Sequence, residues 1–217
     1  MYYIIGDIHG EFVKLQTLIR TVLADFDVAQ DKFIFLGDYI DRGEFTFQTV
    51  EFLINFAKKY NAVFLTGNHE DMLQRYLANR DTGFYLYNGG LATVKSYKKA
   101  LGHMTIPNNH KEFFSELKLY YEGDDFIAVH AGLHPDCEDL LKQNPDDLKW
   151  IREEFYLSKK RWPKTVIFGH TPVRMITKNS GVYFDEKRNI IGIDNGVFLG
   201  YPLLCLRWPD RKVYASS

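Results

Sequence analysis

The chain has 217 residues, of which 46% are hydrophobic and 25% are charged, and its formal net charge is −1. These values fit one globular domain, and the balanced charge excludes the strongly basic surface of a general nucleic-acid-binding protein. The first ten residues lack the basic start of a signal peptide, and no apolar run approaches the ~20 residues of a membrane span, so we expect a cytoplasmic protein without a membrane partner.

Short apolar runs recur along the chain, and each ends in glycine or histidine among polar residues. They are YYIIGD (2–7), KFIFLGD (32–38), AVFLTGN (62–68), FIAVHAG (126–132), TVIFGH (165–170) and IIGIDNG (190–196). Runs of β-branched and aromatic residues without strict alternation predict strands that are covered on both faces. From about Thr165 onward the strand-like segments follow one another closely, which predicts one antiparallel meander that closes the domain.

Two segments between these runs have helical periodicity. FVKLQTLIRTVLADF (12–26) places Phe12, Leu15, Leu18, Ile19 and Val22 on one stripe, and FQTVEFLINFAKKY (47–60) repeats the pattern. Alternating strands and helices predict an α/β fold. We expect a single domain over 1–217, in which the more helical and irregular segment 71–125 forms a cap over a site.

Polar residues that can bind metal ions or take part in catalysis follow the predicted strands. Loops at the carboxyl ends of strands line a shared crevice in α/β folds, so these residues should meet. They are Asp7 and His9, then Asp38, Asp41 and Arg42, then Asn68, His69 and Glu70, and finally His130 and His170. Glu70 is expected to cap or orient the segment after His69, since an acid is favoured at a helix N-terminus. Each alone fits ordinary turn chemistry, but their repetition at successive strand ends indicates a site. The remaining histidines, His103, His110 and His134, fit no motif and are interpreted as surface or loop residues.

The types of side chain indicate which ligand this site takes. Carboxylate, imidazole and amide oxygen, without thiolate, suit Mn²⁺, Fe or Zn²⁺. Six candidates are too many for one tetrahedral zinc with an open position, but they suffice for two ions that share a carboxylate. The six are Asp7, His9, Asp38, Asn68, His130 and His170. Paired metal ions are typical of phosphate-ester hydrolysis.

The motifs GDIHG, GDYIDRG, GNHE, HAG and GHT, in this order over 6–171, resemble the signature of the phosphoprotein phosphatase family of the calcineurin-like metallophosphoesterases. The resemblance implies a β-sandwich of two mixed sheets flanked by helices, in α/β/β/α layers. IGIDNGVFLG (191–200) is similar to the closing segment of the bacterial and phage branch. That branch includes protein phosphatases and symmetrical diadenosine tetraphosphate hydrolases, and NGG with the following SY (88–97) looks more like the former.

The resemblance also implies a role for each motif residue. Asp7 and His9 would hold a first metal, Asp38 would bridge two metals, and the second would be completed by Asn68, His130 and His170. His69 would be the general acid, paired with Asp41. Arg42 would bind phosphate oxygens, and WIR (150–152) offers Arg152 as a second phosphate arginine. Two divalent ions are expected, with Mn favoured and Fe or Zn as alternatives.

These residues support a one-step hydrolysis in which a metal-bridging hydroxide attacks phosphorus and His69 protonates the leaving group. The first hypothesis is a protein serine/threonine phosphatase that acts on phosphorylated proteins. The alternative is a symmetrical bis(5′-nucleosyl)-tetraphosphatase or a nucleic-acid-end phosphatase, for which Phe84, Tyr85 and Tyr87 are candidates for a nucleoside pocket. Base rates for aromatic residues favour packing for these three. A third hypothesis is a catalytically dead binding module, which the full set of motif residues disfavours.

Overall fold

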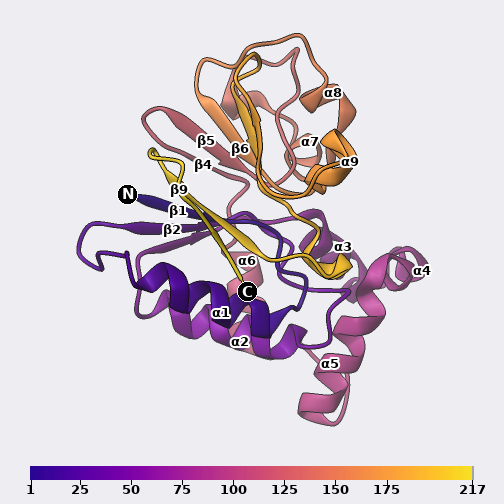
Figure 1. Ribbon diagram of the computed structural model, residues 1–217. Coiled ribbons are helices and arrows are strands. Elements are labelled where there is room, and N and C mark those ends of the chain that lie inside the picture. The colour runs from indigo at the N-terminus through magenta and orange to yellow at the C-terminus, as the bar shows by residue number, and fades with distance from the viewer. Residues whose placement is uncertain (217) are drawn as a thin grey trace.

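Two five-stranded sheets form the centre of the molecule in the computed structural model, which describes residues 1–216 (Figure 1). In spatial order, the first sheet contains β10 (Val213–Ala215), β9 (Leu204–Trp208), β1 (Tyr2–Ile5), β2 (Lys32–Phe35) and β3 (Ala62–Phe64). The second contains β4 (Tyr120–Glu122), β5 (Phe126–Val129), β6 (Thr165–Phe168), β8 (Ile190–Gly192) and β7 (Tyr183–Asp185). Strands β1, β2 and β3 are parallel, as are β5, β6 and β8.

The alternation of side chains along each strand explains why two sheets can pack together. In β1, Tyr3 and Ile5 pack into the helix-covered core of the first sheet, whereas Ile4 packs into a core between the sheets. Likewise Ile127 and its neighbours on one face of β5 pack against helices, while Phe126 lies in the core between the sheets. Both faces of β1 and β5 are thus apolar, which produces uninterrupted hydrophobic runs in the sequence at these strands.

Helices cover the outer face of each sheet. The apolar residues of α1 (Phe12–Leu23) and α2 (Thr46–Ala57) join the core of the first sheet. Those of α7 (Pro145–Trp150) and α8 (Glu153–Tyr156) join the core of the second. Of the predicted stripe of α1, Leu15, Leu18, Ile19 and Val22 are buried, whereas Phe12 at its start is half-buried. The expected α/β/β/α sandwich of two mixed sheets is therefore confirmed.

The remaining helices lie at one end of the sandwich or connect the strands (Figure 1). They are α3 (Asn68–Leu77), α4 (Thr82–Tyr85), a π-helical turn (Leu86–Gly90), α5 (Leu91–Leu101), α6 (Asn108–Ser115) and α9 (Val173–Thr177). Two 3₁₀ turns occupy Leu140–Lys142 and Val197–Leu199. Over residues 1–216 we find no helix that combines the length and apolar character needed to cross a membrane.

Two predictions about this fold are wrong. The segments after Thr165 do not form one antiparallel meander, because β6 and β8 are parallel neighbours in the second sheet while β9 and β10 pair in the first. Nor is His110 a surface residue: it is buried, and its ring contacts Tyr97 and Glu51.

Candidate metal centre

The carboxyl ends of the parallel strands in both sheets meet at one place and bring the predicted site residues together. Asp7 follows β1, Asp38 follows β2 and His170 follows β6, yet the backbone N–H of His170 lies 3.1 Å from both carboxylate oxygens of Asp7. His130 follows β5 and donates its Nδ1–H to the Leu36 carbonyl, which belongs to the other sheet, at 2.9 Å. The site therefore joins the two sheets.

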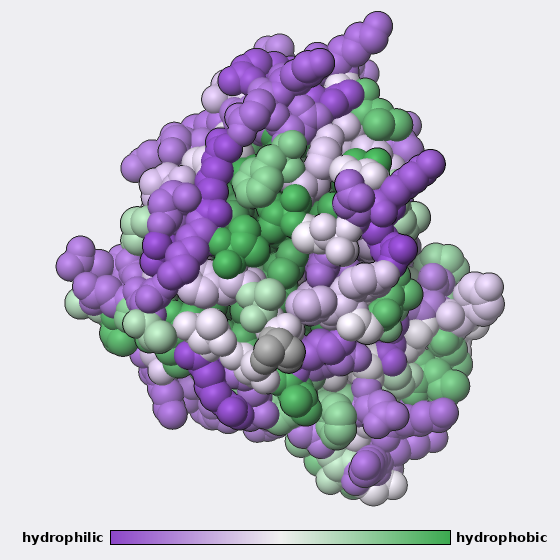
Figure 2. Space-filling view, viewed as in Figure 1, coloured by the Kyte–Doolittle hydropathy of each residue, from purple (hydrophilic) through white to green (hydrophobic). Residues whose placement is uncertain are grey.

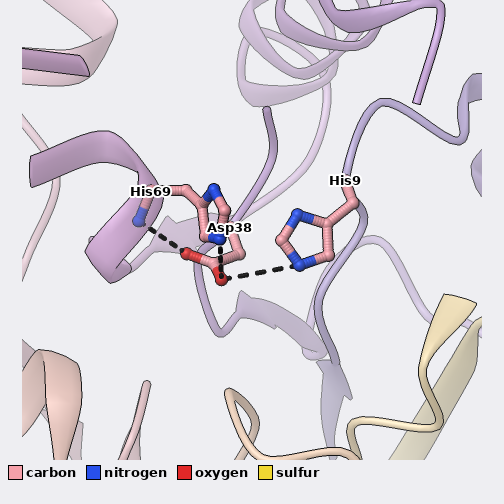
Figure 3. A group of neighbouring side chains, drawn as sticks. All are labelled: His9, Asp38 and His69. Atoms are coloured by element: carbon pink, nitrogen blue, oxygen red, sulfur yellow. Dashed lines mark hydrogen bonds and ion pairs between the residues drawn. The ribbon is translucent and has the colours of Figure 1, made fainter. Parts of the chain in front are cut away.

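A first group of candidate metal-ligand atoms comes from Asp7, His9 and Asp38, all buried. His9 Nε2 lies 3.6 Å from Asp38 Oδ2 and 4.0 Å from Asp7 Oδ2, and Figure 3 shows its ring turned toward Asp38. His9 Nδ1 contacts the Ile40 carbonyl at 3.0 Å. Because a carbonyl can only accept, Nδ1 carries the proton, and the unprotonated Nε2 lies near both carboxylates and accepts from Arg42 Nη1 at 2.8 Å.

A second group consists of Asn68 Oδ1, His130 Nε2 and His170 Nδ1, which lie 2.9–3.2 Å from one another. In each histidine the other ring nitrogen again donates its N–H to a carbonyl. His130 donates to Leu36, and His170 donates to Trp150 at 3.2 Å. Three lone pairs therefore converge on one point, an arrangement that suits a cation far better than a hydrogen bond.

Asp38 lies between the two groups and faces each with a different oxygen. Oδ2 is directed toward His9, while Oδ1 lies 3.5 Å from His130 Nε2. No sequence pattern could specify this orientation. One carboxylate with an oxygen toward each set of ligands is the arrangement that two neighbouring cations would require.

The electrostatics of the site also call for cations. Burial, with the charges of Asp194 and Asp38, raises the pKa of Asp7 well above its usual value, and burial lowers the pKa of His9 and His170. The buried carboxylates thus face imidazoles that are held neutral. His9 and His170 therefore supply no positive charge to balance the acids. Neutral imidazoles and carboxylates are the ligand forms that divalent ions bind, and the donor set therefore fits two such ions.

His69 lies close to Asp38 but has a different partner from the other histidines. Its Nδ1 lies 2.7 Å from Asp41 Oδ2, a carboxylate instead of a carbonyl, and its Nε2 lies 3.9 Å from Asp38 Oδ2. Although burial opposes protonation, Asp38 and Asp41 raise the pKa of His69 above its usual value. His69 is thus the one histidine of the centre that its surroundings favour as a cation, and hence as a proton donor.

Two arginines border the ligand groups. Arg42 Nη1 lies 2.8 Å from His9 Nε2, and its guanidinium lies 4.0 Å from the centre of the Phe198 ring. Arg152 donates to the His170 carbonyl at 3.3 Å and to the Thr171 hydroxyl at 3.0 Å. One arginine thus lies beside each ligand group, where a forked donor can reach phosphate oxygens.

The backbone around these residues is unusual. His9, Asp38, Asp41, Arg42 and His170 all have positive φ, between 47° and 70°. This left-handed conformation is uncommon in non-glycine residues and concentrates at functional sites. Close packing adds a further constraint, because a Cβ at Gly67 would collide with Asp38 Oδ1 and one at Gly169 would collide with Asp7 Oδ1.

Sequence reasoning missed the part that three residues play in shaping the centre. Tyr85 and Thr93 both donate hydroxyls to Asp41 Oδ1, at 2.8 and 2.6 Å, whereas the sequence offered Tyr85 only as a candidate for a nucleoside pocket. Asp194 follows β8, so the search for polar residues at strand ends could have found it, and burial with the charge of Asp38 raises its pKa to about 6. Glu70 caps α3 as the sequence predicts: it accepts backbone N–H groups from Gly67, Asp38 and Tyr39, and thereby fixes the turn that carries Asp38.

Comparisons with known proteins agree with this geometry. The family model described as "Calcineurin-like phosphoesterase" matches residues 2–197. A bis(5′-nucleosyl)-tetraphosphatase PrpE [asymmetrical] from Anoxybacillus flavithermus is 27% identical over 240 residues, covering 98% of this chain and 92% of the relative. A symmetrical bis(5′-nucleosyl)-tetraphosphatase from Vibrio campbellii is 23% identical and covers 99% of this chain and 98% of the relative.

Solved structures show the same fold. "Crystal structure of a putative diadenosine tetraphosphatase" aligns with a TM-score of 0.71 and 24% identity, over 99% of this chain and 91% of the other. A protein serine/threonine phosphatase from Saccharomyces cerevisiae aligns with a TM-score of 0.57 and 18% identity, over 89% of this chain and 66% of the other.

Proposed function

The chain belongs to the calcineurin-like phosphoesterase family, whose members are metal-dependent phosphoesterases, and from this premise we propose that its substrates are dinucleoside polyphosphates. The favoured reaction is asymmetrical hydrolysis of diadenosine tetraphosphate, in which one water molecule yields ATP and AMP. Relatives that this chain matches almost end to end carry that activity in their names. The observation that carries the proposal is Asp38, with one oxygen toward each ligand group.

The residues fit two divalent ions, with Mn²⁺ favoured. Asp7 and His9 would hold one ion, Asn68, His130 and His170 would hold the other, and Asp38 would contribute to both. When bound, such ions lower the pKa of a water molecule to near neutrality and polarise phosphoryl oxygens. The protein's part is to keep the histidines neutral and oriented, which it does through the carbonyls of Ile40, Leu36 and Trp150.

Three other residues act on the substrate directly. Arg42 and Arg152 neutralise phosphate oxygens through charge-assisted hydrogen bonds. His69, with its Nδ1–H held by Asp41, donates the Nε2 proton to the departing oxygen.

A second candidate is hydrolysis of phosphoserine and phosphothreonine in proteins. The Asp41–His69 pair is the observation that favours it, because an alkoxide leaving group needs a proton donor more than a phosphate leaving group does. The same pair serves both reactions, so only kinetics can rank the two substrates.

The test is a kinetic panel on metal-depleted protein reloaded with Mn²⁺, Fe²⁺, Zn²⁺ or Ni²⁺. Substrates are diadenosine tetraphosphate, phosphoserine and phosphothreonine peptides, and p-nitrophenyl phosphate, with nucleotide products separated by chromatography. We expect the largest kcat/KM for diadenosine tetraphosphate, with ATP and AMP in equal amounts. Two ADP molecules per turnover would indicate the symmetrical reaction instead. A higher kcat/KM for phosphopeptides would favour the second candidate, and inactivity with every metal would reject both.

A further inference from the structure

A hollow beside the metal centre has not yet been given a role. It has a volume of about 270 Å³ and is lined by Met72, Arg75, Asp81, Phe84, Tyr85 and Trp150. These residues belong to α3, α4 and α7, or to the loop before α4 (Figure 1). The volume is close to the lower end of the ~300–1,000 Å³ that small-molecule sites usually have.

The hollow is directly connected to the proposed catalytic residues. Tyr85 donates its hydroxyl to Asp41, the partner of His69. On the other side, the Trp150 carbonyl accepts the Nε2–H of His170, and the Trp150 ring lies 6.3 Å from the His170 ring. A molecule in this hollow would therefore lie close to Asp41, the partner of His69, and to His170 of the second ligand group.

Aromatic surface dominates this hollow. Phe84 is 53% exposed although it is a large apolar residue, and its ring lies 6.4 Å from that of Trp150, inclined by 41°. Figure 2 shows apolar side chains gathered over α4 at the right of the view. Exposed aromatic faces of this kind are suited to stacking against a flat ring.

Two polar side chains complete the lining and match one class of flat ring. Arg75 pairs with Asp71 at 2.9 Å through one of its five N–H donors and has others to offer, and Asp81 is an acceptor. Adenine carries acceptor ring nitrogens and a donor exocyclic amine, and its flat ring presents two faces for stacking. Tyr85 is not available for such contacts, since it is buried and its hydroxyl is used by Asp41. Tyr87 is 91% exposed and lies outside this lining.

We propose that this hollow binds the adenine base of the leaving nucleotide, with Phe84 and Trp150 as its stacking surface. The proposal rests on the proposed function, because it names the part of a dinucleoside polyphosphate that this side of the site recognises. It also explains the exposure of Phe84 in a helix of only four residues.

The test compares Phe84→Ala with a matched control, Phe184→Ala, which removes an exposed phenylalanine from β7 in the second sheet. Inhibition constants of AMP and of ribose 5-phosphate, which lacks the base, are measured against p-nitrophenyl phosphate hydrolysis. The kcat/KM for diadenosine tetraphosphate is measured in parallel. Melting curves of both variants establish that each is folded.

We expect Phe84→Ala to raise the inhibition constant of AMP and to lower kcat/KM for diadenosine tetraphosphate, each by about tenfold. The inhibition constant of ribose 5-phosphate should stay within about twofold of wild type, and Phe184→Ala should resemble wild type throughout. Equal effects on AMP and ribose 5-phosphate, or no effect on either, would overturn the proposal. Because AMP inhibition is measured without diadenosine tetraphosphate, a wild type that fails to hydrolyse that substrate would reject the proposed function separately.

Discussion

The two aspartates of GDYIDRG stand three positions apart and have opposite surroundings. Asp38 is enclosed by His9, His69 and His130, and although burial alone would raise its pKa, the positive charge that His69 favours and the His69 backbone N–H hold that pKa below the usual value. Asp41 instead accepts hydrogen bonds from three side chains and lies beside only one of those histidines. One acid is thus suited to metal ions and the other to orienting His69.

The first prediction concerns His69. His69→Asn removes the proton donor, and general acid catalysis is typically worth ~10²–10⁴-fold. We expect turnover of phosphoserine peptides to fall within that range and turnover of p-nitrophenyl phosphate to fall far less, because nitrophenolate leaves without a proton. Bound Mn²⁺, measured by elemental analysis, should remain at the wild-type level. Loss of metal in this variant would mean that His69 is a ligand.

At the scale of elements, α4 and α5 are linked to the centre through Asp41. Tyr85 in α4 and Thr93 in α5 both donate to its Oδ1, and the Asp41 backbone N–H donates to the Thr93 hydroxyl at 3.0 Å. We propose that this part of the segment 71–125 acts as the predicted cap. Its role is to complete the hydrogen bonds of the acid that orients His69.

The second prediction tests this link. Thr93→Val keeps the shape of the side chain but removes the hydroxyl, and loss of such outer partners typically costs ~10–100-fold in activity. We expect kcat to fall within that range while metal content stays unchanged. Thr93→Ser should recover most of the activity because it restores the hydroxyl. A variant with valine that retains full kcat would show that Asp41 does not depend on α5.

The third prediction concerns His110, which links α6 to α2 and α5. Its Nε2 contacts Glu51 at 2.7 Å and its Nδ1 contacts the Tyr97 hydroxyl at 2.7 Å, so the neutral ring donates to Glu51 and accepts from Tyr97. Burial lowers the pKa of His110 below its usual 6.5. The unfolded chain therefore binds a proton more readily than the folded chain, and the stabilisation present above about pH 6.5 is lost as pH falls through the folded pKa.

The direction in which stability changes with pH can be tested by comparing wild type with a variant that lacks His110. Urea midpoints of wild type and His110→Gln are measured at pH 7.5 and 5.5, above the range in which Glu51 titrates. Wild type should lose more stability than the variant between these pH values, since the variant lacks this titrating group. An equal loss in both proteins would show that His110 is not held neutral.

Over the whole molecule, the sequence predicted an α/β fold, strands covered on both faces and the convergence of the strand ends, because apolar runs and the polar residues behind them are local features. The α/β/β/α layers were implied by the resemblance to a known family. The sequence could not assign strands to sheets: the runs after Thr165 look alike, and only packing separates β8 from β9. It also missed the contacts of Tyr85 and Thr93 with Asp41, which span 44 and 52 positions of the chain. Such contacts follow from tertiary packing and leave no pattern in the sequence.

The metal centre draws its proposed ligands from both sheets. Asp7 and Asp38 follow strands of the first, whereas His130 and His170 follow strands of the second. The central claim is therefore that two ions lie between the sheets and that Asp38 belongs to both.

The number of ions per chain tests this claim most directly. Wild type, Asp38→Asn and Asp41→Asn are equilibrated with Mn²⁺, freed of excess metal, and analysed for manganese and protein, with melting curves to establish folding. We predict two ions in wild type, two in Asp41→Asn despite its loss of turnover, and at most one in Asp38→Asn. A wild type that binds a single ion, or a folded Asp38→Asn that still binds two, would contradict the shared carboxylate.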